Sequence, residues 1–112
     1  MKVSINGGHT AKARGMSSSA LGFDEYTEDR KMVEAFTRAM QKAGWETHNS
    51  CTEEETQNAD LTQICRLSNA SGADLFVSWH FNSFNGSAKG TEVYTSNYEN
   101  ADTNNMAARI SE

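Results

Sequence analysis

Residues 73–79 contain a continuous apolar run, Leu75-Phe76-Val77. A short apolar run without polar alternation is typical of a strand that is buried on both faces, as in a parallel sheet. We therefore predict that this segment is the central strand of a sheet. His80 follows directly and is expected just beyond the carboxyl end of that strand.

Three further segments before this run show a regular pattern. Residues 2–6 alternate apolar and polar side chains, which predicts a short strand. Residues 25–43 carry apolar side chains at spacings of three and four, which predicts a helix, and residues 45–50 alternate weakly, as in a second strand. Residues 11–23 have no period and are expected to form a surface loop.

The start of the helix that precedes the apolar run has two interpretations. Thr52 and Glu55 match a capping box and could open it. The better N-cap is Asp60, because an inner face then follows at helical spacing. That predicted inner face consists of Leu61, Ile64, Cys65 and Ser68. The helix would end at Ser71 and Gly72.

Strand and helix patterns alternate along the whole chain. After a turn-like stretch at residues 82–90, residues 91–95 alternate as a strand would, and residues 104–110 resemble the opening of a helix. Such alternation predicts an α/β fold, in which a twisted open sheet carries helices on both faces and the crossovers are right-handed.

Composition narrows the function classes. The 112 residues suffice for one domain, and the net charge of −5 argues against a nucleic-acid or anionic membrane surface. Cys51 and Cys65 are too few for a disulfide framework, so we expect free thiols, although a disulfide between them is possible. No membrane span or signal peptide is expected, which predicts synthesis in the cytoplasm.

Two histidines and one glutamate are candidate metal ligands. His9 and His80 each follow a predicted strand, and α/β sheets bind ligands beyond the carboxyl ends of their strands. Glu25 opens the first helix on its inward stripe, and Asp29, one turn later, is its alternative. Two histidines and a carboxylate form a catalytic zinc set that leaves the fourth position open.

Spacing alone favours a plainer interpretation of these residues. A histidine after a strand is more often a hydrogen-bonded loop residue, and a glutamate in a first turn often only opposes the helix dipole. His48 stands in the weak second strand between polar neighbours, and we expect it to be exposed.

Several motifs resemble the zinc-dependent N-acetylmuramoyl-L-alanine amidases. They are Gly7-Gly8-His9, Asp24-Glu25-Tyr26, Ser78-Trp79-His80-Phe81-Asn82 and the flanking segments 69–74 and 90–94. Their order also matches, and the resemblance covers nearly the whole chain. It implies that residues 1–112 are an incomplete three-layer amidase domain, truncated at its C-terminal end.

The resemblance also implies a role for individual residues. His9, Glu25 and His80 would bind one Zn²⁺ per chain, and Asn82 would lie beside the site as a substrate-binding residue. Trp79 replaces the small aliphatic residue that is usual in the family, which is expected to alter local packing.

The implied reaction is hydrolysis of the amide between N-acetylmuramic acid and L-alanine in peptidoglycan. The family uses a second glutamate on a late strand as general acid and base, and no residue here is assigned to that role. We therefore expect a fragment of a longer enzyme, such as a phage-type endolysin that acts on the cell wall. The alternatives are a non-catalytic, zinc-containing wall-binding module, a short or inactive form of the same fold that keeps the metal site without the second glutamate, and a metal-free α/β domain.

Overall fold

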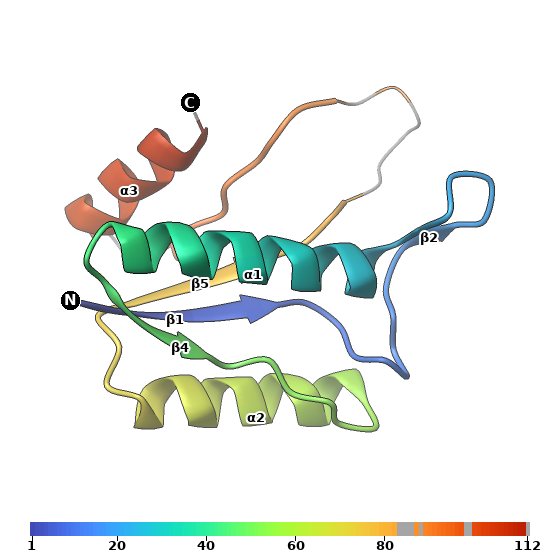
Figure 1. Ribbon diagram of the computed structural model, residues 1–112, viewed down its shortest axis with the longest axis horizontal. Helices are drawn as coiled ribbons and strands as arrows, with labels where there is room; N and C mark the ends of the chain where they lie inside the picture. The colour runs from blue at the N-terminus through green and yellow to red at the C-terminus, as the bar shows by residue number, and fades with distance from the viewer. Residues whose placement is uncertain (83–86, 88, 98–99, 112) are drawn as a thin grey trace. The chain divides into compact units, whose positions relative to one another are not determined.

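The computed structural model describes residues 1–82, 87, 89–97 and 100–111 (Figure 1). The chain groups into two compact units, residues 1–82 and residues 83–112. Every candidate metal ligand belongs to the first unit.

A three-stranded parallel sheet forms the centre of the first unit, in the order β4-β1-β5. Its elements are β1 (Lys2–Gly7), α1 (Glu25–Lys42), β4 (Glu46–Asn49), α2 (Gln57–Ala70) and β5 (Leu75–Trp79). The chain moves from β1 to β4 on one side and then to β5 on the other, so right-handed crossovers put α1 and α2 on opposite faces. Figure 1 shows the sheet between these two helices, which confirms the predicted fold class.

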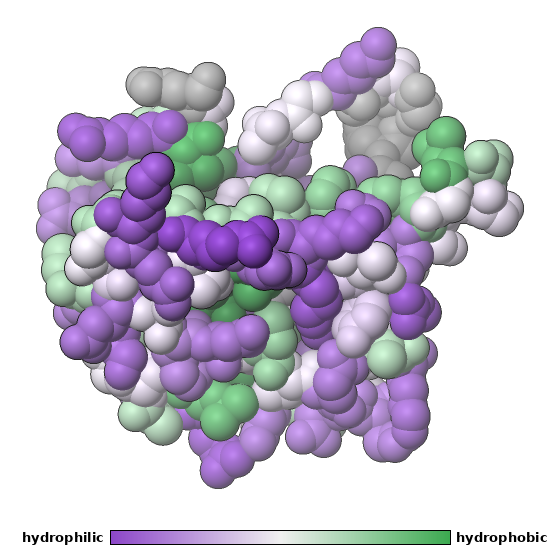
Figure 2. All heavy atoms as spheres, in the orientation of Figure 1, coloured by the Kyte–Doolittle hydropathy of each residue, from purple (hydrophilic) through white to green (hydrophobic). Residues whose placement is uncertain are grey.

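The apolar core lies between the sheet and α1. Val3 and Ile5 of β1 are fully buried and pack with Val33 of α1. Leu75 and Val77 of β5 pack on the same face because they pair in register with Val3 and Ile5. Each such side chain stabilises the fold by about 1.5–3 kcal/mol when fully buried. The face of the molecule that Figure 2 shows is largely hydrophilic.

The opposite face of the sheet is polar and is held by hydrogen bonds. Ser4 Oγ donates to Ser50 Oγ at 3.0 Å, and both residues are fully buried. Asn6 Nδ2 donates to the Ser50 carbonyl at 3.4 Å, and Ser78 Oγ donates to Asn6 Oδ1 at 2.9 Å. Buried polar groups need such partners, so this network fixes how the three strands lie together.

The prediction that β5 is a central strand buried on both faces is wrong for the described residues. β1 is the strand with a neighbour on each side. Phe76 keeps 47% of its surface exposed, because it points away from the face on which Leu75 and Val77 pack against α1. A run of three apolar residues therefore does not distinguish a strand buried on both faces from a strand that carries one exposed apolar side chain.

The predicted start of α2 is also wrong. Thr56 is the N-cap and accepts from the Ala59 amide at 3.2 Å, so the helix begins at Gln57. Asp60 is buried inside the first turn, where Thr52 Oγ1 donates to its carboxylate. On the predicted inner face, Ile64 is buried, but Leu61 and Cys65 are exposed. Asp60 therefore takes the inward position that the sequence pattern assigns to Leu61.

Smaller differences concern the loop and the second unit. The predicted loop at 11–23 contains a short antiparallel pair, β2 (Ser17–Ser18) and β3 (Phe23–Asp24). In the second unit, α3 (Ala101–Ser111) confirms the predicted helix and begins three residues earlier. Residues 91–95 form no strand, since no strand in the described part of that unit pairs with them. Of the predicted turn, residues 83–86 and 88 lie outside the described residues.

Cys51 and Cys65 are both free thiols, as predicted. Among the helices whose structure is described, none is long and apolar enough to cross a membrane.

Candidate metal site

The topology of the sheet brings His9 and His80 to one edge of it. Gly7 of β1 pairs with Trp79 of β5, and the Gly8 amide donates to the Trp79 carbonyl at 2.9 Å. The two strands are parallel neighbours, so the residues that follow them leave the same edge of the sheet. β4 and β5 lie on opposite sides of β1, so the strand order reverses at this point, and α/β sheets bind ligands at such a switch point.

Glu25 lies between the two imidazoles. Its Oε2 lies 3.2 Å from His9 Nε2, and its Oε1 lies 3.3 Å from His80 Nδ1. The imidazole rings are 5.4 Å apart, centroid to centroid, and meet edge to face. One potential ligand atom from each residue lies within 4.8 Å of the other two. Three donors that are distant in sequence therefore converge on one point.

The Glu25 carboxylate is buried yet ionised. Only 4% of the residue is exposed, and the amides of Met16 and Phe81 each donate to one carboxylate oxygen at 2.9 Å. Burial raises the pKa of Glu25, but these two amides, together with the nearby His9 and His80, outweigh burial and bring the pKa below its ordinary value. A carboxylate in this state is a ready metal ligand.

The donor set fits a zinc ion. Zinc lies about 2.0–2.2 Å from histidine and carboxylate ligands, so two ligands of a tetrahedral site are about 3.4 Å apart. His9 Nε2 lies 3.2 Å from one Glu25 carboxylate oxygen and His80 Nδ1 lies 3.3 Å from the other, which is close to that value. With one donor atom from each residue, all three lie within 4.8 Å of one another. Three protein ligands leave one tetrahedral position open, which is typical of catalytic rather than structural zinc.

Two glycines make room for the cluster. A Cβ on Gly8 would lie 2.1 Å from the His80 ring. A Cβ on Gly15 would lie 2.6 Å from both Glu25 Oε2 and His9 Nε2, and its φ of +76° disfavours other residues as well. A side chain at Gly8 or Gly15 would therefore prevent the close approach of the backbone to the candidate ligands.

Asp29, the alternative to Glu25, is not part of the cluster. It is fully buried on α1, and the point where a Cβ of Gly7 would stand is 3.1 Å from its Cβ. Neither carboxylate oxygen has a hydrogen-bond partner among the described residues. Burial, together with the charge of Glu25, raises the pKa of Asp29 to about 7.

His48 and Asn82 lie outside the cluster of ligand atoms. His48 is half-buried in β4, with Nδ1 3.4 Å from Ser4 Oγ, so the prediction of an exposed side chain is wrong. Asn82 is exposed two residues after His80, and its contact with substrate remains a prediction.

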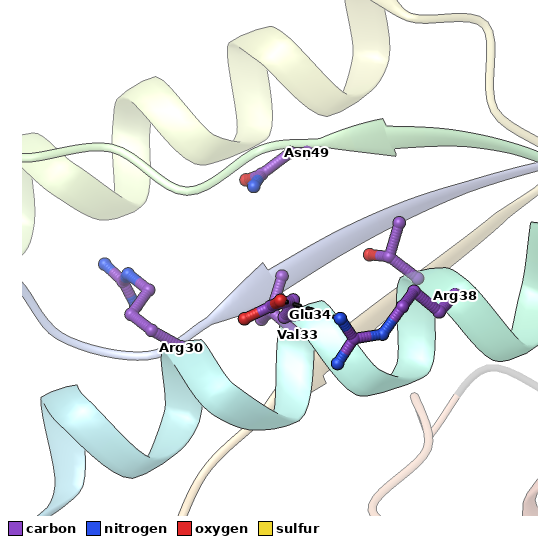
Figure 3. A pocket seen from close by; sticks show the side chains of 6 residues that line it. Arg30, Val33, Glu34, Arg38 and Asn49 are labelled. Carbon is purple, nitrogen blue, oxygen red and sulfur yellow. Dashed lines mark hydrogen bonds and ion pairs between the residues drawn. The ribbon is translucent and has the colours of Figure 1, made fainter.

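A groove of about 410 Å³ lies elsewhere, along α1 and β4 (Figure 3). Its lining contains none of the three candidate ligands and consists of Arg30, Val33, Glu34, Thr37, Arg38 and Asn49. Arg38 pairs with Glu34, one turn earlier on α1, at 2.8 Å. The groove is therefore separate from the candidate metal site.

Comparison with known proteins gives the cluster its context. A family model described as N-acetylmuramoyl-L-alanine amidase matches residues 3–112. The chain belongs to this amidase family. The match includes all three candidate ligands and confirms the resemblance drawn from the motifs around them.

An uncharacterized protein of Clostridium perfringens (strain 13 / Type A) is similar to this amidase-family chain. The two are 34% identical over 82 residues, which is 72% of this chain and 23% of the relative. The chain thus spans under a quarter of the length of the curated relative that it matches. No solved structure matches the chain. That residues 1–112 form one domain that lacks its C-terminal part remains a prediction.

Two residues that lie near the candidate ligands of this amidase-family chain were not predicted from the sequence. Arg30 donates to the carbonyls that lead into His9, and Glu53 accepts from the Ala11 amide at 2.9 Å. Arg30 occupies an ordinary exposed-looking helical position, and Glu53 stands in an acidic run that is typical of a solvated face or a helix start. No local pattern predicts either contact, since both depend on how the loop folds back.

Proposed function

We propose that this chain hydrolyses the amide between N-acetylmuramic acid and L-alanine in peptidoglycan, with one Zn²⁺ bound by His9, Glu25 and His80. The observation that carries the proposal is the convergence of two imidazoles and a buried, ionised carboxylate, at the switch point of an amidase-family sheet. Its site of action would be the cell wall, as for an endolysin.

The chemistry of the donor set supports hydrolysis. Zinc at this point would polarise the amide carbonyl and bring the pKa of a water molecule to about 7. The two imidazoles must be neutral to bind a cation, and the ionised Glu25 between them supplies negative charge. The open fourth position leaves room for water or substrate.

The residues around the cluster support a role in holding its geometry. The Phe81 amide fixes Glu25 from the β5 side, and the Met16 amide fixes it from the loop side. The Phe81 ring packs edge to face on Phe23 with 5.4 Å between centroids. Asn82 comes next and is exposed, and we propose that its amide contacts the substrate. We assign no general acid or base.

The test is release of new L-alanine amino groups from purified peptidoglycan by the zinc-loaded chain. We expect release that stops when a chelator removes the metal and that His80→Ala abolishes. If the chain with one zinc bound released no L-alanine amino groups, the proposed hydrolase activity would be contradicted. Cosedimentation with peptidoglycan would then report the alternative, a wall-binding module.

A further inference from the structure

The side chain of Arg30 binds the backbone carbonyls at and before His9. Arg30 Nη1 donates to the carbonyls of Gly7 and Gly8 at 2.8 and 3.1 Å, and Arg30 Nη2 donates to the carbonyl of His9 at 2.9 Å. These carbonyls are consecutive and lie at the carboxyl end of β1. The planar guanidinium, with five donors in a fixed fork, is suited to bind them together.

The backbone at this point needs such support. His9 has φ of 67°, the left-handed conformation, which is unfavourable for a residue with a Cβ. Gly7 and Gly8 directly before it have the greatest freedom to lose on folding. The conformation that directs the imidazole of His9 toward Glu25 therefore persists only where neighbouring groups hold it.

The guanidinium is itself held in place. It stacks over the Tyr26 ring at 4.5 Å from the centroid, and Arg30 Nη2 lies 3.4 Å from Glu53 Oε1. Tyr26 Oη donates to the same carboxylate oxygen at 2.8 Å. The second oxygen of Glu53 accepts from the Ala11 amide at 2.9 Å. Arg30 and Glu53 thus fix the chain both before and after His9.

We propose that Arg30, supported by Glu53, is a positioning residue that holds residues 7–11 so that His9 meets Glu25 and the metal. This inference rests on the proposed function, because it assumes that His9, Glu25 and His80 bind zinc. Arg30 itself lies at the strand end, near the arrowhead of β1 in Figure 3, whereas Arg38 lies farther along α1.

The test compares Arg30→Ala and Arg30→Lys with Arg38→Ala, whose arginine is exposed and pairs with Glu34. Zinc affinity is measured by competition with a chromophoric chelator, at a temperature where circular dichroism shows each variant folded. The visible spectrum of the Co²⁺-substituted protein reports the ligand geometry. Loss of groups that orient metal ligands typically weakens binding about 10–100-fold.

We expect Arg30→Ala to weaken zinc binding at least tenfold and to alter the Co²⁺ spectrum, and Arg38→Ala to match the wild type. Arg30→Lys should weaken binding less, because one ammonium reaches fewer of the carbonyls. If Arg30→Ala does not fold, Arg30→Lys and Glu53→Gln provide the measurement.

Wild-type zinc affinity and an unchanged Co²⁺ spectrum in the folded Arg30 variants would overturn the inference and leave the proposed function standing. Absence of zinc binding by the wild-type protein would instead contradict the proposed function. A purely structural role would lower the melting temperature and leave the affinity of the folded protein unchanged.

Discussion

Glu25 Oε1 lies 3.3 Å from His80 Nδ1, although the two residues are 55 positions apart. The first opens α1, and the second follows β5. They meet because β5 returns beside β1, so that the end of one strand and the start of the helix after the other lie at the same edge of the sheet. The fold thus explains how three candidate ligands without a compact sequence motif come together.

Gly15→Ala is expected to weaken zinc binding by at least tenfold. The new Cβ would stand 2.6 Å from Glu25 Oε2 and from His9 Nε2. The matched control is Gly22→Ala, because Gly22 also has positive φ, +59°, but no atom stands within 4 Å of the position that its new methyl group would take. Each variant carries a backbone cost of ~1–2 kcal/mol. Calorimetric titration with Zn²⁺ measures the affinity of both variants. Equal zinc affinities would contradict a steric clash of the Gly15→Ala methyl group with Glu25 and His9.

Asp29→Asn is expected to stabilise the zinc-free protein at pH 8 and to change little near pH 3.5. The pKa of Asp29 is about 7 when folded, against 3.8 when free, so the folded state retains a proton that the unfolded state loses. The protonated Asp29 therefore makes its full contribution to the free energy of unfolding below about pH 4, and this contribution is lost as the pH rises to about 7.

The shift in Asp29 corresponds to at most ~4 kcal/mol, and we expect roughly 1–3 kcal/mol in urea unfolding at pH 8. Glu34→Gln, at an exposed position of the same helix, is the control for the loss of one negative charge. If Asp29→Asn changed the free energy of unfolding by the same amount at pH 3.5 and pH 8, the pKa of Asp29 would not be raised in the folded protein.

Thr56→Ala is expected to destabilise the protein by about 1 kcal/mol, because it removes the side-chain cap of the Ala59 amide. Thr62→Ala is the control. Its hydroxyl donates to the Asn58 carbonyl inside the helix, and alanine is the better helix former there. Thermal unfolding should rank Thr56→Ala below both wild type and Thr62→Ala. The opposite order would support a helix start other than Gln57.

Much of the fold could be predicted because its signals are local. The alternation in residues 2–6 and the helical period in 25–43 identified β1 and α1 nearly to the residue. The start of α2 could not be found in the same way. Thr56 and Asp60 are both good caps, and the choice depends on the hydrogen bond from Thr52 to Asp60, which forms only in the folded chain.

The candidate ligands could be named from their places at the strand ends together with the resemblance to the amidase family, although spacing alone favoured a plainer interpretation. His9 and His80 stand directly after strands, and parallel strands end at the same edge of the sheet. Their distances to Glu25, the left-handed conformation of His9 and the contacts of Arg30 arise from tertiary structure. Sequence patterns of period two or 3.6 carry no information about such contacts.

The most direct test of the zinc site is the zinc content of purified protein by elemental analysis, without chelator, for wild type, His9→Ala, His80→Ala and His48→Ala. His48 is the matched control because it lies in β4, outside the cluster. We predict one zinc per chain in wild type and His48→Ala, and much less in the other two variants. Near-zero zinc in the wild type, or full zinc in His9→Ala and His80→Ala, would contradict the site.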